Sequence, residues 1–109
     1  MTEEIKILSF LGIATKAGKT CSGEEAVESA IKNEKAVLVI VAADASENTK
    51  SKFRSMCKYR YIKYAEFGTR ELIGPRVGKD SRTVVAVIDK GFGDKLHEMI
   101  VGFESPTQN

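Results

Sequence analysis

The sequence predicts an α/β domain in which helices cover both sides of one small sheet. Residues 36–43 and 83–88 are continuous apolar runs rich in β-branched side chains, as in central strands that are covered on both faces. Segments with helical periodicity alternate with these runs, which favours a layered arrangement. The 109 residues, 42% of them hydrophobic, suffice for one domain with a real core. We therefore expect a single domain over residues 1–104 and a flexible tail over residues 105–109.

The first half of the chain is expected to hold two helices and two strands. Thr2 can cap a first helix whose apolar side chains share one face, and Gly18 can end it. A short strand at residues 20–22 and a tight turn at Gly23 precede a second helix over residues 24–35. The run at 36–43 follows as a central strand.

The second half begins with a third helix that starts at Asp44 or Ser46 and reaches about residue 58. Residues 59–64 are rich in β-forming side chains and predict a strand. Thr69 then caps a short helix that Pro75 should end, and a basic loop spans residues 76–80. After the strand at 83–88, glycines at 91 and 93 predict a turn into a last helix over residues 94–101.

Composition narrows the class of protein. The net charge of +2 and the pI of about 8.5 are too weak to indicate nucleic-acid binding by themselves, so the placement of charge must decide. Cys21 and Cys57 lie outside any metal-ligand spacing, which indicates free thiols in a reducing compartment. The acidic N-terminus lacks the order of a signal peptide, and the longest apolar run is too short for a membrane span. We expect a cytoplasmic protein that does not associate with membranes.

Enzymatic motifs fail on spacing or context. Gly18-Lys19-Thr20 resembles the end of a phosphate-binding P-loop, but the first glycine of that motif should stand at Ile13, and the tripeptide follows a predicted helix instead of a strand. Asp44 and Asp89 are better explained as helix caps or turn residues, and His97 as a solvent-facing histidine. We therefore expect no enzyme, no catalytic residue, no cofactor and no metal site.

Two basic loops that are rich in glycine are the best candidates for a ligand site. Glycine lets a nucleic-acid backbone come close, and lysine and arginine neutralise phosphate. The backbone N–H groups at the start of the second helix add further donors for a phosphate. Glu24 and Glu25 repel phosphate, yet their carboxylates can accept from base N–H groups. The cations of these loops are Lys16, Lys19, Arg76, Lys79 and Arg82, and the glycines are Gly18, Gly23, Gly74 and Gly78.

Several motifs along the chain together carry a resemblance. They are Gly12-Ile13-Ala14, Lys16-Ala17-Gly18-Lys19, Ser22-Gly23-Glu24-Glu25, Asp44-Ala45-Ser46-Glu47-Asn48-Thr49, residues 74–79, and Val85-Ala86-Val87-Ile88-Asp89-Lys90-Gly91-Phe92. As a set, over about residues 5–100, they resemble the kink-turn RNA-binding ribosomal proteins of the large subunit in archaea and eukaryotes. Within that family the sequence is most similar to the small bacterial branch of YlxQ type.

The resemblance implies a three-layer α/β/α sandwich with a four-stranded mixed sheet. It also implies a monomer that binds structured RNA, ribosomal or another kink-turn RNA, and that associates with the ribosome and translation. Two regions of such proteins grip a kinked RNA helix. The residues that match these two regions are Gly23, Glu24, Glu25, Ala26 and Ser29, and Gly74, Arg76, Val77, Gly78 and Lys79. Together with Lys16, Gly18, Lys19 and Ser22 of the first loop, they are the RNA-binding residues that we expect. Val77 would lie near an extruded nucleotide.

The sequence departs from the wider family at three positions and from the YlxQ-type branch at a fourth. Asn or Lys usually stands where this chain has Glu25, Glu or Gln where it has Ala26, and Lys where it has Ser29. Pro75 replaces a residue that is commonly basic in the YlxQ-type branch. The acidic pair Glu24 and Glu25 keeps an alternative open, namely a protein-interaction module in ribosome or translation-factor assembly.

Overall fold

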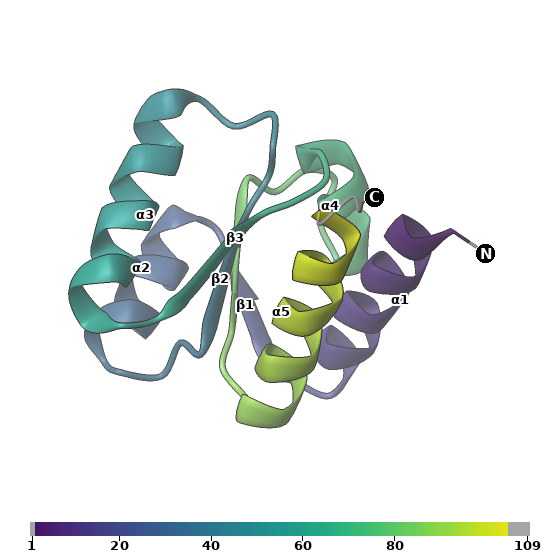
Figure 1. The fold of residues 1–109 in the computed structure, drawn as a ribbon, viewed down its shortest axis with the longest axis horizontal. Helices are drawn as coiled ribbons and strands as arrows, with labels where there is room; N and C mark the ends of the chain where they lie inside the picture. Colours follow the sequence, from purple (N-terminus) through teal and green to yellow (C-terminus); the bar gives the residue numbers. More distant parts are fainter. Residues whose placement is uncertain (1, 105–109) are drawn as a thin grey trace.

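One sheet of four strands runs through the described part of the chain (Figure 1). The computed structural model describes residues 2–104, so the tail predicted at 105–109 lies outside the described residues. The strands stand in the order β1-β4-β2-β3, with bounds β1 (Thr20–Ser22), β2 (Leu38–Val41), β3 (Lys63–Glu66) and β4 (Val84–Val87). β2 and β3 are parallel, whereas β4 is antiparallel to both of its neighbours. The sheet is therefore mixed, as expected.

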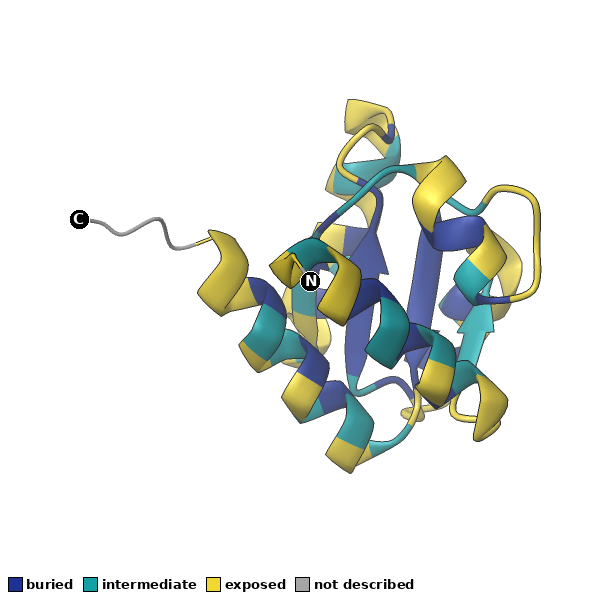
Figure 2. Cartoon of the chain, turned by 90° about the vertical axis from the view of Figure 1, so that its right-hand side faces the viewer, coloured by how far each residue is buried: buried dark blue, intermediate teal, exposed yellow. Residues whose placement is uncertain are grey.

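Within the described residues, five helices cover the two faces of the sheet: α1 (Glu3–Lys16), α2 (Glu24–Lys32), α3 (Glu47–Arg60), α4 (Arg70–Arg76) and α5 (Lys90–Glu104). α2 and α3 lie on one face, and α1, α4 and α5 lie on the other (Figure 1). All residues of β2 and β4 are buried between these layers, and both strands are dark blue in Figure 2. The predicted three-layer α/β/α sandwich is confirmed.

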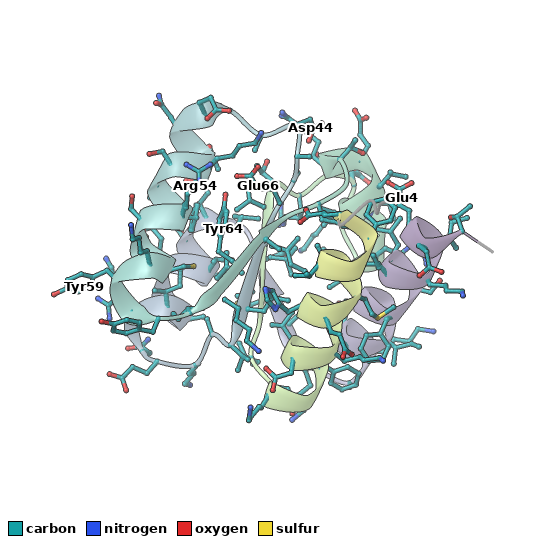
Figure 3. All side chains as sticks on the ribbon, in the orientation of Figure 1. Glu4, Asp44, Arg54, Tyr59, Tyr64 and Glu66 are labelled. Carbon is teal, nitrogen blue, oxygen red and sulfur yellow. The ribbon has the colours of Figure 1, made fainter. Side chains whose placement is uncertain are left out.

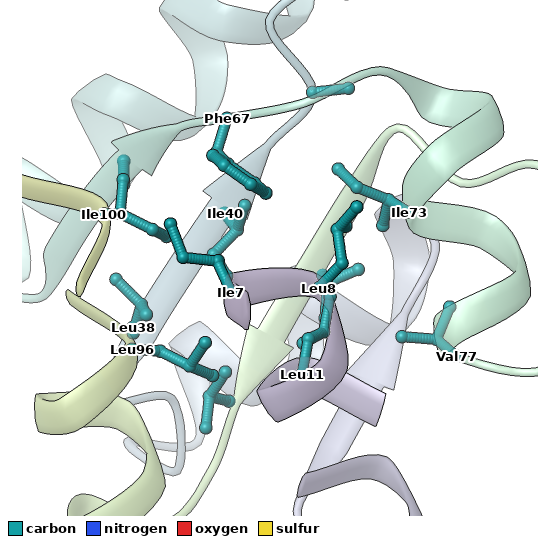
Figure 4. Packing of buried hydrophobic residues seen from close by; sticks show 14 residues of the cluster. Ile7, Leu8, Leu11, Leu38, Ile40, Phe67, Ile73, Val77, Leu96 and Ile100 are labelled. Carbon is teal, nitrogen blue, oxygen red and sulfur yellow. The ribbon is translucent and has the colours of Figure 1, made fainter. Parts of the chain in front are cut away.

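Alternate side chains of β2 belong to two separate cores. Leu38 and Ile40 join the larger cluster, which packs under α1, α4 and α5 (Figure 4). Val39 and Val41 join the cluster under α2 and α3. Because successive strand residues point to opposite faces, a strand that is covered on both sides must be apolar at every position. The uninterrupted apolar run in the sequence has this physical cause.

Side-chain caps begin three of the helices at the predicted residues. The hydroxyl of Thr2 accepts a hydrogen bond from the backbone N–H of Ile5 at 3.1 Å. Ser46, and not Asp44, caps α3, and Thr69 caps α4. A hydroxyl in this position satisfies one of the N–H groups that have no partner in the first turn.

The strand predicted over residues 59–64 is wrong in its first half. Tyr59 and Arg60 continue α3, and Tyr61 ends this helix in the left-handed conformation with a φ of 59°. β3 begins only at Lys63 and ends at Glu66. The β propensity of tyrosine is a weak preference that depends on context. Here the helix continues for three residues beyond the buried Cys57.

The helix that Pro75 was expected to end continues to Arg76, so the loop begins one residue later than predicted. Proline removes one N–H donor from the last turn, the donor that would reach the carbonyl of Glu71. Both Pro75 and Glu71 are exposed, so this bond is lost where water is accessible. The buried Ile73 keeps the short helix in contact with the core.

The last helix begins four residues earlier than predicted, and the expected turn at residues 91–93 does not form. Asp89 caps the helix, since its carboxylate accepts from the N–H of Phe92 at 2.9 Å and its carbonyl accepts from the N–H of Gly93 at 2.8 Å. Gly93 is buried, and a Cβ there would lie 2.8 Å from the side chain of Val37. The glycines were interpreted as turn residues, but Gly93 instead permits close packing of α5.

The segments that connect strands and helices lie at the two ends of the strands. We call these two ends the edges of the sheet. At the first, β1, β2 and β3 end and β4 begins. We call this the Gly23 edge, and with the adjoining starts of α2 and α4 it comprises residues 23–26, 42–46, 67–70 and 77–83. At the second, Thr20, Val87, Leu38 and Lys63 lie in one row across the sheet. We call this the Tyr61 edge, and with the adjoining ends of α2 and α3 it comprises residues 17–19, 32–37, 58–62 and 88–89.

Candidate functional site

The turn from β1 into α2 presents free backbone donors at the Gly23 edge. Gly23 has a φ of 95°, which side-chain-bearing residues rarely adopt, and it precedes α2 without a side-chain cap. Its own N–H donates to the carbonyl of Val84 at 3.0 Å. The N–H groups of Glu24, Glu25 and Ala26 find no acceptor within residues 2–104. A helix start of this kind favours an anionic ligand group.

Arg82 joins the α4–β4 connection to this turn. Its Nε atom donates to the hydroxyl of Ser22 at 3.0 Å, and its backbone N–H donates to the carbonyl of Arg70 at 3.1 Å. Arg70 in turn donates from its backbone N–H to the carboxylate of Asp44 at 3.1 Å and from its guanidinium to the Asp44 carbonyl at 3.0 Å. Four segments that are distant in sequence are thus tied together at one edge.

Glu24 and Glu25 at the start of α2 have different surroundings. Glu24 forms an ion pair with Lys52 on α3 at 3.4 Å, and Lys52 also contacts Glu28. The hydrogen bond from Lys52 lowers the pKa of Glu28 and raises the pKa of Lys52. Glu25 has no ion pair within residues 2–104. The carboxylate of Glu25 is therefore the acceptor that remains available beside the free N–H groups.

Lys16, Arg76 and Gly78 meet at a groove between α1 and α4. Together with Gly12, Ile13 and Pro75 they line a cavity of about 430 Å³. Gly12 lies close beneath Arg76, because a Cβ at that glycine would be 3.9 Å from both the Arg76 side chain and its carbonyl. The structure therefore brings the cation at the end of α1 together with the first cation of the second loop.

Some of the other predicted site residues are exposed to solvent, and others are buried. Gly78 and Lys79 in the α4–β4 connection are exposed, as are Glu24, Glu25, Ala26 and Ser29 on α2. Val77, which was expected near an extruded nucleotide, is instead buried in the larger core cluster. Val77 is the residue that directly follows α4, and its side chain packs with that cluster.

Gly74 is buried, and packing accounts for its being glycine. A Cβ at this position would lie 2.5 Å from the backbone nitrogen of Ser81. Its carbonyl accepts from the N–H groups of Val77 and Lys79. Gly74 thus holds the α4–β4 connection against α4 instead of offering a surface to a ligand.

Gly18 and Lys19 lie at the Tyr61 edge, at the opposite end of β1 from Gly23. The Lys19 carbonyl accepts from the N–H of Ile88 at 2.9 Å, next to the pair formed by Thr20 and Val87. The sequence placed Lys19 and Gly23 in one loop because β1 between them is only three residues long. The structure does not bring Lys19 together with the α4–β4 connection.

Arg70 and Arg82 are the cations of the Gly23 edge that were not assigned to the predicted site. Arg82 was recognised as a cation of the basic loop, and Arg70 was not singled out. The signal for Arg70 was its place directly after the Thr69 cap, at the first residue of the helix that follows β3. The signal for Arg82 was its place before the buried strand β4.

The residues considered for catalysis have structural surroundings. Asp89 caps α5, and Asp44 accepts from Arg70, while His97 on α5 is half-buried and not fully solvent-facing. Cys21 and Cys57 are free thiols, and burial raises the pKa of Cys57 to about 11. No cluster of three metal-ligating side chains forms among residues 2–104. In the same residues, none of the helices has both the length and the apolar character that crossing a membrane requires.

Sequence comparison identifies the family. The family described as ribosomal protein L7Ae/L30e/S12e/Gadd45 matches residues 5–97 of the chain. The chain belongs to this family. This L7Ae-family chain is 41% identical over 91 residues to the RNA-binding protein YlxQ of Bacillus subtilis, a match that covers 84% of the chain and 91% of the relative. It is 40% identical over 97 residues to the RNA-binding protein YlxQ of Enterococcus faecium, covering 89% and 93%. The resemblance drawn from the motifs, including the YlxQ-type branch, is confirmed.

Solved structures share the L7Ae-family fold. A protein of unknown function from Bacillus halodurans superposes with a TM-score of 0.85 at 38% identity, covering 88% of this chain and 97% of that one. The 15.5 kD RNA-binding protein of Giardia lamblia superposes with a TM-score of 0.75 at 18% identity, covering 94% and 88%. The second likeness shows the common fold alone.

Proposed function

We propose that this protein is a non-enzymatic RNA-binding protein that recognises kink-turn or similarly kinked RNA in the context of the ribosome and translation. The observation that carries the proposal is the contact of Arg82 with Ser22, which sets a cationic connection beside the free N–H groups of α2. Two relatives at about 40% identity are named RNA-binding proteins, which supports the RNA partner. We further propose that it acts in the cytoplasm as a monomer.

The chemistry of the Gly23 edge supports a division of roles. The N–H groups of Glu24, Glu25 and Ala26 suit one phosphate, and Gly23 leaves the backbone open to close approach. Lys79 and Arg82 suit phosphates of the adjoining strand. The carboxylate of Glu25 suits the exocyclic amino groups of unstacked or sheared bases, which a kinked RNA helix exposes.

The proposal is tested by measuring the affinity of the protein for a kink-turn RNA and for a straight duplex of equal length and composition. We expect the kink-turn RNA to bind more tightly at every salt concentration, because a kinked helix exposes the unstacked and sheared bases that we propose Glu25 contacts. Equal affinities would remove specific recognition and leave only electrostatic attraction. A matched variant, Glu25→Gln, tests the base contact, since it keeps the shape of the side chain but removes its charge.

One observation favours a second candidate, a protein-interaction module in ribosome or translation-factor assembly. The Gly23 edge carries the carboxylates of Glu25, Asp44 and Asp80 among its cations, and carboxylates disfavour phosphate. A binding partner captured from cells distinguishes the two. Capture that survives complete nuclease digestion, and that Glu25→Gln weakens, supports the protein partner.

A further inference from the structure

Two tyrosines at the end of the molecule far from Gly23 are unusually exposed. Tyr59 is 80% exposed and Tyr61 is 96% exposed, the highest values among the large apolar side chains. Figure 3 shows Tyr59 projecting from α3 at the left of the view, whereas Asp44 of the Gly23 edge lies at the top of the view. A single exposed apolar side chain is common on protein surfaces, whereas exposed apolar side chains that lie together mark interaction sites. The surroundings of the two tyrosines therefore decide whether they mark such a site.

A cavity adjoins these tyrosines. It has a volume of about 390 Å³ and is lined by Ile31, Glu34, Ala36, Arg60, Tyr61 and Ile62. Arg60 lines this cavity, and its guanidinium carbon also lies 5.9 Å from the ring centre of Tyr59. Arg60 thus connects the cavity with the second aromatic ring. The ring of Tyr59 therefore lies near the Arg60 guanidinium, and Tyr61 lines the same cavity as Arg60.

The surrounding charge is positive. Lys32, Lys35, Lys58 and Arg60 are all exposed there, and none has an ion-pair partner within residues 2–104. Glu34 is the carboxylate among them. Cations in the last turns of α2 and α3 also complement the helix dipoles, which explains the sign of the charge. The dipoles do not explain why the side chains at 59 and 61 are aromatic and exposed.

Tyr61 also occupies a backbone conformation that favours glycine. With a φ of 59° it stands at the position after α3 where glycine commonly ends a helix. A side chain in this conformation is strained relative to glycine. Since Tyr61 is almost fully exposed, packing within the fold does little to compensate for the strain. Strain of this kind at an exposed aromatic residue points to a function for the side chain.

We propose that the Tyr61 edge binds unpaired nucleotides of RNA. Bases would stack on the rings of Tyr59 and Tyr61, and the phosphates would lie against Lys58, Arg60 and Lys35. This combination of exposed aromatic rings and a cationic surface is how single-stranded nucleic acid is bound without sequence preference. The site is separate from the Gly23 edge, so it goes beyond the kinked-RNA proposal and does not rest on it.

A fluorescein-labelled oligouridylate too short to fold tests this site through fluorescence anisotropy. The double variant Tyr59→Ala/Tyr61→Asn removes both rings, and asparagine tolerates the left-handed conformation at position 61. We expect its affinity to fall at least about fivefold, since stacking of one base already accounts for that much. Thermal unfolding of the variant confirms that it folds. Unchanged affinity in the folded double variant, or no binding by the natural sequence, would overturn the proposal.

Two controls separate stacking at this edge from other binding. Lys6→Ala removes an exposed lysine of α1 that belongs to neither edge, and it should leave oligouridylate affinity unchanged; a loss equal to that of the tyrosine variant would overturn the assignment to the Tyr61 edge. Polyglutamate of matched charge should bind more weakly than oligouridylate and should not respond to the tyrosine variant. Equal binding of the two polyanions would contradict stacking. Failure of a kink-turn RNA to bind would contradict the function proposed for the Gly23 edge and would leave the proposal for the Tyr61 edge unaffected.

Discussion

The Nε atom of Arg82 donates a hydrogen bond of 3.0 Å to the hydroxyl of Ser22, which stands 60 residues earlier in the chain. This contact lies where β1 ends and β4 is about to begin, and the N–H of Gly23 reinforces it by donating to the carbonyl of Val84. The α4–β4 connection therefore lies beside the start of α2 as a direct consequence of pairing β1 with β4. The pairing of β1 with β4, and not either loop alone, brings the parts of the candidate site together.

The two lysines of the predicted site allow a matched test of this geometry. Lys79 is exposed beside the Gly23 edge, and Lys19 belongs to the Tyr61 edge. We expect Lys79→Ala to reduce the slope of log affinity against log salt by about 0.7–0.9 for a kink-turn RNA, the loss of one phosphate contact. Lys19→Ala removes the same charge and should leave the slope unchanged.

Titrations of both variants over a range of salt concentrations provide the measurement. An equal reduction of the slope in both variants would mean that the RNA senses the overall charge and not the Gly23 edge. No reduction in either would remove Lys79 from the interface.

Much of the fold follows from local signals in the sequence. The apolar runs at 36–43 and 83–88 predicted β2 and β4, because strands covered on both faces have no polar position. The hydroxyls at Thr2, Ser46 and Thr69 predicted three helix starts, because capping is a local interaction.

The features that the sequence did not predict depend on partners distant in the chain. A short strand was predicted between Lys19 and Gly23, but nothing local says that it pairs with β4, which fixes the end of the sheet at which each of the two residues lies. Gly74 and Gly93 resemble loop glycines, but each faces another segment at a distance that no Cβ tolerates. Val77 resembles a loop residue, but its side chain is buried in a cluster whose other members come from segments distant in the sequence. Arg82 could be recognised as a cation, whereas its contact with Ser22 required the strand order.

Gly74 and Gly102 offer a matched pair for the packing argument. A Cβ at Gly74 would lie 2.5 Å from the backbone nitrogen of Ser81, whereas a Cβ at Gly102 would meet nothing within 4 Å. We expect Gly74→Ala to lower the free energy of unfolding by about 1–3 kcal/mol, because backbone must move to admit the methyl group. Gly102→Ala should raise it by up to about 1 kcal/mol through helix propensity. Urea unfolding measures both, and similar effects of the two variants would contradict the close contact.

Asp94 predicts a pH-dependent contribution to stability. Its carboxylate accepts from Lys90 at 2.7 Å and from Lys63 at 2.9 Å, and these hydrogen bonds lower the pKa of Asp94 to about 2. Because the pKa is lower in the folded state than in the unfolded state, the stabilisation is complete above about pH 4. It is lost as the pH falls from there toward 2. We expect Asp94→Asn to be less stable than the natural sequence near neutral pH and equally stable near pH 2.

The two lysines supply the control for that measurement. In a background with both Lys63→Ala and Lys90→Ala, Asp94→Asn should have the same small effect at every pH. A pH-dependent difference that persists in this background would assign the effect to other groups.

The left-handed conformation of Tyr61 predicts that a smaller residue stabilises the fold. We expect Tyr61→Gly to raise the free energy of unfolding by about 0.5–1 kcal/mol, the relief of backbone strain minus the greater freedom of glycine in the unfolded chain. Tyr59→Gly, two residues earlier and inside α3, should instead lower it by about 1 kcal/mol. Urea unfolding at one temperature compares the two variants.

The same Tyr61→Gly protein separates stability from binding. If it is more stable yet binds oligouridylate more weakly, the loss of affinity belongs to the missing ring and not to unfolding. If instead Tyr61→Gly is less stable than the natural sequence, the contacts of the tyrosine ring with its neighbours outweigh the strain. The aromatic side chain would then be explained by the fold alone, and the strain at position 61 would no longer support a nucleotide site at the Tyr61 edge.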